Sequence, residues 1–333
     1  MSLRVAPTID SLNKIYIQLN NYIEPLIIVL GTIGNIASIY IFTRPSLKSP
    51  CSLYFLASSI NNFAILYFGI VTRMLADGYD IDPTSYSRFF CKFRNYFSYM
   101  IYLVSPLLIV LTTVDRFCAS STNSQRRKFS SIIISRWAIG CVAIFALLFF
   151  IHILIFFEID INSHICQPKL GLYSDLLGLS TLAIYVIGLC LMMVFGALTI
   201  NNVRNQRRRV KNTNTTNTQS QQERQVDKQL FIMLLLHIAC FVILGLPYVI
   251  MLIFSGVLSA YKTTSIFIFI QNISRILLNL SSSIQFYIYT LGSRLYRQEF
   301  LKALNKLSTR LLGKNIINMK NAIAFNQSKI TQT

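Results

Sequence analysis

The sequence predicts an all-α protein: a bundle of seven transmembrane helices followed by an amphipathic surface helix. Of its 333 residues, 53% are hydrophobic and only 13% are charged, about half of the roughly 25% usual for a soluble domain. The apolar residues are gathered in seven long runs, and most Lys and Arg residues flank one end of those runs. These three observations together predict a multi-pass membrane protein.

Each apolar run is long enough to span a bilayer, because a helix needs about 20 apolar residues to cross roughly 30 Å of hydrocarbon. The second, third and seventh runs carry Arg73, Arg94 and Arg275, so the ends of these three are less sharply defined. The predicted spans are Tyr22–Phe42, Leu53–Leu75, Cys91–Val114, Ile132–Phe157, Tyr173–Ile200, Gln229–Phe254 and Thr264–Leu291.

The segments around the spans complete the predicted organisation: an extracellular N-terminus (1–21), a seven-helix domain (22–291) and a cytoplasmic tail (292–333). The first run starts too late and is too long for a cleaved signal peptide. Residues 205–225 are polar without apolar periodicity, which predicts disorder. After the seventh run, apolar and basic residues separate onto two helical faces, which predicts a helix on the membrane lipid surface ahead of a disordered end.

Charge predicts the orientation. One side of the predicted membrane carries 22 of the 31 Lys and Arg residues and 4 of the 12 Asp and Glu residues, hence +18 of the net charge of +19. Cytoplasmic loops collect positive charge, so we expect the N-terminus outside a plasma membrane and the C-terminus in the cytosol. A nucleic-acid partner is not indicated, because the basic residues flank spans instead of clustering on a soluble module.

Two of the seven cysteines, Cys91 and Cys166, fall on the outer side. An isolated pair in an oxidising space predicts one disulfide, although two free thiols remain an alternative. The bridge would hold the loop after the fourth span over the third span, as a lid on an outer cavity.

The cytosolic end of the third span carries Asp115-Arg116-Phe117, with Arg116 placed 25 residues after Cys91. This pattern resembles the D/E-R-Y/F motif of rhodopsin-like (class A) G-protein-coupled receptors. The resemblance extends from about residue 22 to residue 300. Further matching positions are Asn35, Trp137, Phe241, Pro247, Tyr289 and Tyr296. A narrower resemblance, to invertebrate peptide receptors, rests on the segments LYFLASSI and FYIYTLGSRLYR.

The resemblance implies a cell-surface receptor, not an enzyme, that binds an extracellular ligand without a cofactor and activates a heterotrimeric G protein. Arrestin is a further expected partner. The residues assigned to G-protein coupling and switching are Asp115, Arg116, Phe117, Asp227, Phe241, Pro247 and Tyr289. Departures from the family pattern put its usual switch in doubt, because Leu244-Gly245 replaces C-W and Gln285-Phe286 replaces N-P. Either Asn62 or Ile60 stands at the position of the second-helix aspartate, which puts the family's sodium site in doubt as well.

Arg116 needs partners, because an unpaired charge at a membrane boundary is costly. Asp115 is adjacent. Asp227 lies 20 residues before Pro247, or about 30 Å along a helix at 1.5 Å per residue, at the same end of the bundle. We expect an Arg116–Asp227 pair that holds the third and sixth spans together. The alternative is that Asp227 is simply a solvated charge.

The resemblance also disfavours three ligand classes. Retinal would need a lysine in the seventh span, which has none; amines would need an aspartate where Ser98 stands; and hormone-like proteins would need a large ectodomain. We expect a cavity lined by aromatic and charged side chains. Its candidate ligand-binding residues are Glu24, Arg73, Arg94, Ser98, Tyr99, Tyr102, Tyr248, Gln271 and Arg275.

The three arginines would receive an anionic group such as a peptide carboxylate. Glu24 would pair with Arg275, in a contact that is either functional or purely structural, and an acidic outer rim that includes Asp77 would steer cationic peptides. A short peptide is the favoured ligand, and a chemosensory small molecule is the alternative. The sequence lacks the inverted repeats and mid-span carboxylates of a transporter, and its histidines lack metal-binding spacing.

Overall fold

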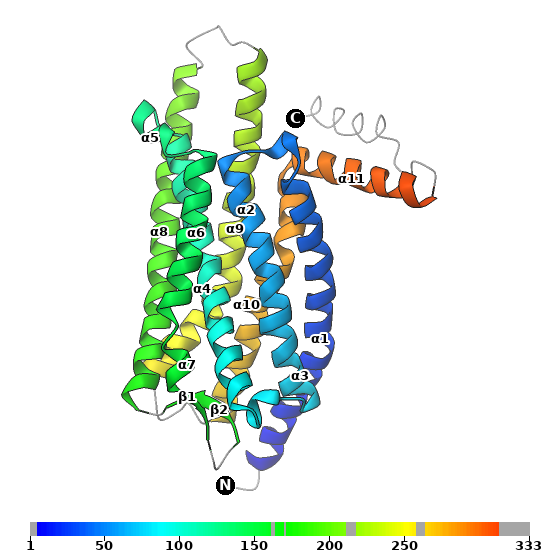
Figure 1. The fold of residues 1–333 in the computed structure, drawn as a ribbon, viewed down its shortest axis with the longest axis vertical. Coiled ribbons are helices and arrows are strands. Elements are labelled where there is room, and N and C mark those ends of the chain that lie inside the picture. The colour runs from blue at the N-terminus through cyan, green and yellow to red at the C-terminus, as the bar shows by residue number, and fades with distance from the viewer. Residues whose placement is uncertain (1–4, 161–163, 170, 211–217, 258–263, 313–333) are drawn as a thin grey trace.

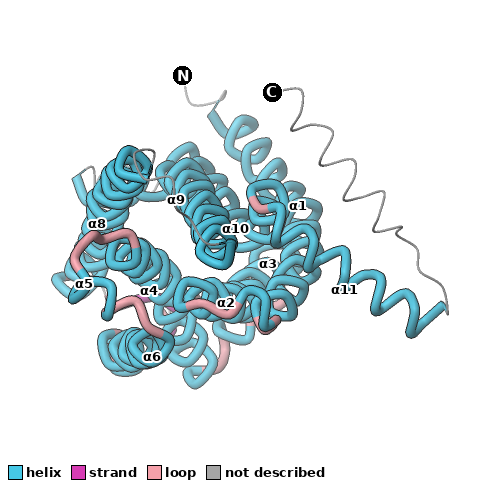
Figure 2. Tube along the Cα trace, turned by 90° about the horizontal axis from the view of Figure 1, so that it is seen from above, coloured by secondary structure: helices cyan, strands magenta, loops and turns pink. Residues whose placement is uncertain are grey.

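The fold is a bundle of seven long helices that run side by side, with one further helix turned away from it (Figure 1). The computed structural model describes residues 5–160, 164–169, 171–210, 218–257 and 264–312. Seen along the bundle, α11 extends outward beyond α1 and α2 (Figure 2). The predicted fold is confirmed, apart from one short β-hairpin.

The spans follow one another in sequence order. The first is α1 (Val5–Phe42), and the second is α2 (Pro50–Ala64), a π-helical segment (Ile65–Val71) and α3 (Thr72–Tyr79). The others are α4 (Arg88–Ala119), α6 (Ile132–Phe149) with α7 (Ile153–Phe156), α8 (Leu172–Val210), α9 (Thr218–Val257) and α10 (Ser265–Gly292). Shorter elements are the 3₁₀ turns Pro45–Leu47 and Pro83–Ser85, and α5 (Ser124–Lys128).

Six of the described helices are long and apolar enough to cross a membrane. The seventh, α10, is more polar because it carries Arg275, Asn279 and a run of serines. Several of these polar side chains are buried within the bundle, including Asn279 at 2% and Ser283 at 3% exposure. A helix that turns its polar side chains toward other helices instead of lipid can remain in a membrane.

Two helices extend beyond the predicted spans. α1 begins at Val5, so the predicted N-terminal segment (1–21) is helical from Val5 onward and continuous with the first span. This extension contacts α3: Asn20 Nδ2 donates to the Met74 carbonyl at 3.1 Å, and Asn21 Nδ2 donates to the Gly78 carbonyl at 3.4 Å. These tertiary contacts stabilise the extension, together with Tyr16 and Leu19, which pack in a buried cluster.

The disorder predicted for residues 205–225 is wrong at both ends of that segment. α8 continues to Val210 and α9 begins at Thr218, and residues 211–217 lie outside the described part. Extending an existing helix avoids the cost of nucleation, so these polar turns add to helices that the bundle already anchors.

A two-stranded antiparallel hairpin of β1 (Phe157–Ile159) and β2 (Cys166–Pro168) covers one end of the bundle. The predicted disulfide is present and joins Cys166 in β2 to Cys91 in α4, with 5.6 Å between the Cα atoms. We call this the disulfide end, and we call the opposite end of α4 the Arg116 end.

At the Arg116 end, the chain leaves α10 and forms α11 (Arg294–Leu312), the predicted surface helix. Tyr296 anchors it: its hydroxyl is 2.8 Å from Ser38 Oγ, and burial raises the pKa of this hydroxyl, so it stays neutral. The Phe300 ring packs on Phe286 with 5.0 Å between centroids. Residues 313–333, the predicted disordered tail, lie outside the described part.

Candidate functional site

A cavity of about 220 Å³ lies among the helices on the disulfide-end side of the bundle. α3, α4, α8, α9 and α10 all contribute to its wall, as does the π-helical segment. The lining residues are Gly69, Arg73, Arg94, Asn95, Ser98, Tyr99, Tyr102, Leu103, Phe150, Thr181, Ile184, Tyr185, Tyr248, Arg275, Leu278 and Asn279. Of the nine candidate ligand-binding residues, the lining includes all except Glu24 and Gln271.

Helical spacing explains why these side chains converge. On α4, Asn95, Ser98, Tyr99 and Tyr102 recur at intervals of three and four, which places them on one face. The same spacing joins Thr181 to Tyr185 on α8, and Arg275 to Asn279 on α10. Asn95, Thr181, Tyr185 and Asn279 were not predicted, although each lies three or four residues from another lining residue.

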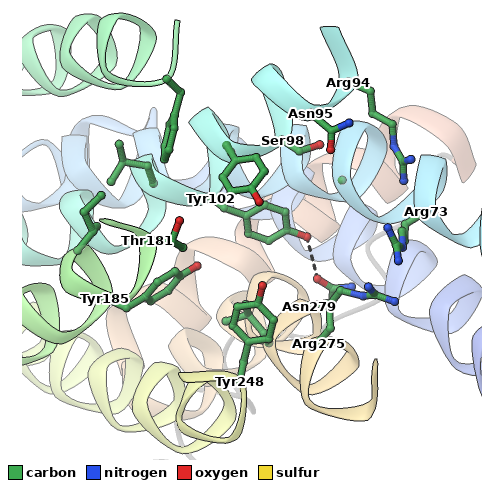
Figure 3. A pocket seen from close by; sticks show the side chains of 16 residues that line it. Arg73, Arg94, Asn95, Ser98, Tyr102, Thr181, Tyr185, Tyr248, Arg275 and Asn279 are labelled. Carbon is green, nitrogen blue, oxygen red and sulfur yellow. Dashed lines mark hydrogen bonds between the residues drawn. The ribbon is translucent and has the colours of Figure 1, made fainter. Parts of the chain in front are cut away.

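The cavity has two chemically different sides. Figure 3 shows Arg73, Arg94 and Arg275 gathered toward one side, with Thr181 and Tyr185 on the other. Arg94 Nε donates to Thr72 Oγ1 at 3.0 Å, and its Nη1 lies 3.9 Å from Asp82 Oδ1. One side therefore suits an anionic group, and the other suits an aromatic or small polar group.

Asp77 binds two of these arginines. Its Oδ2 accepts from Arg73 Nε at 2.8 Å, from Arg275 Nη2 at 3.0 Å and from the Tyr16 hydroxyl at 2.5 Å. The predicted Glu24–Arg275 pair is wrong, because Arg275 pairs with Asp77. Asp77 is also not simply a rim charge, since its contacts join α1, α3 and α10.

Glu24 lies behind the cavity wall. Its Oε1 accepts from Asn279 Nδ2 at 3.1 Å, and Asn279 Oδ1 accepts from the Tyr102 hydroxyl at 2.8 Å (Figure 3). Glu24 is only 4% exposed. Its carboxylate therefore supports two lining side chains from α1 without lining the cavity itself. Gln271 lies one helical turn before Arg275 and is not part of the lining.

At the Arg116 end, Arg116 has two acidic partners. Its Nη2 and Nε donate to Asp115 Oδ2 at 2.6 and 3.0 Å, and its Nη1 donates to Asp227 Oδ1 at 2.7 Å. Ser130 Oγ donates to the other Asp115 oxygen at 2.7 Å. The contact expected from the sequence between α4 and α9 is therefore present. Phe117 packs on Phe195 of α8, with ring centroids 5.6 Å apart.

Between the two ends, a buried chain of hydrogen bonds links α2, α10 and α9. Asn62 Nδ2 donates to Gln285 Oε1, Gln285 Nε2 donates to the Tyr289 hydroxyl at 2.5 Å, and that hydroxyl lies 3.0 Å from His237 Nδ1. Asn62 is 3% exposed whereas Ile60 is 54% exposed, so Asn62 is the residue that faces the bundle. The part that His237 takes in this chain was not predicted from the sequence.

Two of the switch residues expected from the sequence lie along α9. Phe241 is buried in the same core as Tyr289, at 5% exposure, and Pro247 interrupts the helix six residues further on. Because Pro lacks an N–H group, Pro247 removes one backbone hydrogen bond inside α9. Among the described residues, no cluster of His, Cys, Asp or Glu is placed to hold a metal ion.

Comparisons with known proteins identify the family. The family described as 7 transmembrane receptor (rhodopsin family) matches residues 34–289. No curated protein sequence matches the chain. The fold is similar to the crystal structure of squid rhodopsin, with a TM-score of 0.73 and 14% identity over 89% of this chain and 87% of that one. The chain is thus a receptor and not an enzyme, and it belongs to the rhodopsin family of seven-transmembrane, G-protein-coupled receptors.

Proposed function

We propose that this receptor lies in the plasma membrane with the disulfide end outside, binds its ligand in the cavity, and couples to a G protein at the Arg116 end. The positive charge near the Arg116 end supports this orientation, because cytoplasmic segments collect Lys and Arg. The Cys91–Cys166 bridge supports it independently, because disulfides persist in oxidising spaces.

The observation that carries the proposed ligand class is the group of three arginines on one side of the cavity. Guanidinium groups bind carboxylates through charge-assisted hydrogen bonds, so the ligand presents an anionic group there. The cavity volume of about 220 Å³ is below the range of roughly 300–1,000 Å³ typical of drug-sized sites. It suits the terminal residue of a short peptide, with the remaining residues outside the cavity.

A small acidic chemosensory molecule is the second candidate, and the same small volume favours it. Both candidates place the anionic group against Arg94 and Arg275 and leave the Tyr185 side for an aromatic or polar group. They differ in whether contacts continue beyond the cavity toward the β-hairpin. Asn95, which lines the cavity, donates to Cys166 Sγ at 3.0 Å, so the hairpin lies close enough to contact a peptide.

Signalling would connect the two ends through helices that both ends share. α4 and α9 line the cavity and also carry Arg116 and Asp227. A ligand that favours a separated arrangement of α4 and α9 would free Arg116 and expose a groove for the G protein, as a two-state shift. Arrestin would bind the same groove, and α11 would lie against anionic lipid through its basic residues.

The test is a peptide-library screen with a promiscuous G-protein reporter, in which each peptide is supplied with a free and with an amidated C-terminus. We expect activation by the free-carboxylate form, and a loss of at least about tenfold in potency for Arg94→Gln, comparable with removing a charge-assisted hydrogen bond. Arg88→Gln is the matched control, because Arg88 is exposed on α4 and outside the lining.

Activation by neutral or cationic ligands alone, with Arg94→Gln and Arg88→Gln both unchanged, would contradict an anion-binding cavity. Activation by small acids but by none of the peptides would select the chemosensory candidate. A signal from ligand applied only inside the cell would reverse the proposed orientation.

A further inference from the structure

One carboxylate oxygen, Asp77 Oδ2, receives donors from three different helices. Arg73 Nε from α3 lies at 2.8 Å, Arg275 Nη2 from α10 at 3.0 Å, and the Tyr16 hydroxyl from α1 at 2.5 Å. Both arginines line the cavity, whereas Asp77 lies just outside its lining. A carboxylate supplied by the protein itself therefore already binds two of the arginines that line the cavity.

The geometry that holds Asp77 also suits a carboxylate supplied from outside. Guanidinium groups hydrogen-bond to carboxylates preferentially, through planar and often bidentate pairs. The side chains of Arg73 and Arg275 are 46% and 22% exposed, so neither is sealed from an entering ligand. Arg94 forms a weaker ion pair than Arg73 and Arg275 do, since its closest carboxylate oxygen lies 3.9 Å away. An entering anionic group would therefore bind Arg94 first.

The Asp77 contacts also join three helices of the bundle. The outer part of α1 is attached to α3 by Asn20 and Asn21, which donate to backbone carbonyls of Met74 and Gly78. Those bonds do not involve α10. In contrast, Arg275 is the α10 residue that contacts both Tyr16 and Asp77. Removing Asp77 from Arg275 would break the contact between α3 and α10, while α1 would stay attached to α10 through Tyr16 and Glu24.

We propose that Asp77 is a tethered occupant of the cavity's anion site, and that the carboxylate of the ligand replaces it on Arg275 and Arg73. This inference rests on the proposed anionic ligand and adds a specificity rule to it. A ligand succeeds only if its anionic group competes with a covalently held carboxylate, whose effective concentration is high. The replacement breaks the contact between α3 and α10, so ligand recognition and a loosening of the outer part of α10 become one event.

The test uses purified receptor in detergent and acetate as the probe, with acetamide as its neutral isostere and chloride to match ionic strength. Asp77→Ala removes the tethered carboxylate and leaves room beside two uncompensated arginines. We expect a lower Tm than wild type, and a dose-dependent rise of several degrees with acetate but not with acetamide, because a ligand that binds the folded state stabilises it. Wild type should show no such rise.

Two variants make the result specific. Asp77→Ala combined with Arg275→Gln should lose the acetate effect, because the receiving guanidinium is gone. Asp175→Ala, which removes an exposed acid at the start of α8, should show no acetate effect. An acetate response shared by wild type or by the double variant, or no response in folded Asp77→Ala, would overturn the proposal.

If Asp77→Ala does not yield folded protein, Asp77→Asn provides a second measurement in cells, since it keeps an oxygen acceptor and removes the charge. We expect higher basal signalling than wild type at equal surface expression, and unchanged basal signalling would overturn the proposal. The acetate measurement needs no agonist, so a failed peptide screen leaves it interpretable. A successful screen with no acetate effect would refute only the role of Asp77.

Discussion

Arg116 in α4 and Asp227 in α9 meet across the Arg116 end of the bundle, with 2.7 Å between Nη1 and Oδ1. The two partners differ in environment: the Arg116 side chain is 5% exposed, whereas that of Asp227 is 60% exposed. Asp115 binds the remaining face of the guanidinium. Asp227 is thus the partner that solvent or a G protein reaches first. Its carboxylate can also separate from Arg116 and remain hydrated, because the side chain is already exposed.

Asp227→Asn should raise basal signalling about fivefold, because partly exposed ion pairs contribute up to about 1 kcal/mol. The measurement is agonist-free G-protein activation in cells with equal surface expression. Lys228→Gln is the control, because it removes an exposed charge from the same helical turn. Equal basal signalling in wild type and Asp227→Asn would show that this pair does not restrain the receptor.

The hydrogen bond between Tyr289 and His237 should contribute to stability, because both side chains are buried, at 0% and 6% exposure. His237→Leu leaves the Tyr289 hydroxyl one partner short, and unsatisfied buried polar groups cost about 1–3 kcal/mol. We expect a lower Tm for His237→Leu and for Tyr289→Phe.

A double-mutant cycle isolates this contact from the other effects of each change. The double variant should be less destabilised than the sum of the two single variants, since each single change already removes the bond. Tyr287→Phe is the control, because its hydroxyl donates to the Leu30 carbonyl in an exposed setting. Strict additivity of His237→Leu and Tyr289→Phe would mean that the contact contributes nothing.

Much of this architecture could be predicted from the sequence because its signals are local. Apolar runs predict the spans, and the Arg116–Asp227 contact follows from helix rise counted back from Pro247. The Asp77 contacts could not be predicted in this way. Arg275 had two acids within reach, and only the relative placement of α1, α3 and α10 determines that it pairs with Asp77 while Asn279 binds Glu24.

The missed helical segments have a similar explanation. Residues 5–21 place Leu12, Tyr16 and Leu19 at helical spacing, but the stretch is too polar to be taken as part of a membrane span. Hydrogen bonds from Asn20 and Asn21 to α3 stabilise the helix there. His237 was missed because a single histidine in an apolar run reads as a core residue. Its role depends on Tyr289, which is 52 residues away in the chain.

The Cys91–Cys166 bridge closes a loop of 75 residues and should stabilise the folded receptor by about 2–4 kcal/mol. Replacing both cysteines with serine should lower Tm and surface expression, and the cavity should lose its lid because β2 is no longer held to α4. The double variant avoids a new free thiol. Cys190→Ser is the control, since Cys190 is an exposed free cysteine, and an equal loss in that variant would show that the effect is not specific to the bridge.

Gly34 sets the spacing between α1 and α10. A Cβ atom at this position would lie 2.9 Å from Phe286 Cβ, and that atom is fixed to the α10 backbone, so the helices would have to separate. Small residues at helix interfaces in membranes permit such close backbone approach. The separation would also disturb the neighbouring Asn35, whose Nδ2 donates to the Ser282 carbonyl at 3.1 Å.

Gly34→Ala should therefore destabilise the receptor by about 1–3 kcal/mol, the usual cost of overpacking, measured by thermal unfolding in detergent. Gly140→Ala is the matched control, because no atom lies within 4 Å of the added Cβ. That variant gains helix propensity of up to about 1 kcal/mol without a clash, and Gly34→Ala carries the same gain. The difference between the two variants thus measures the α1–α10 contact alone, and equal melting temperatures would show that α10 can move away from α1 at no cost.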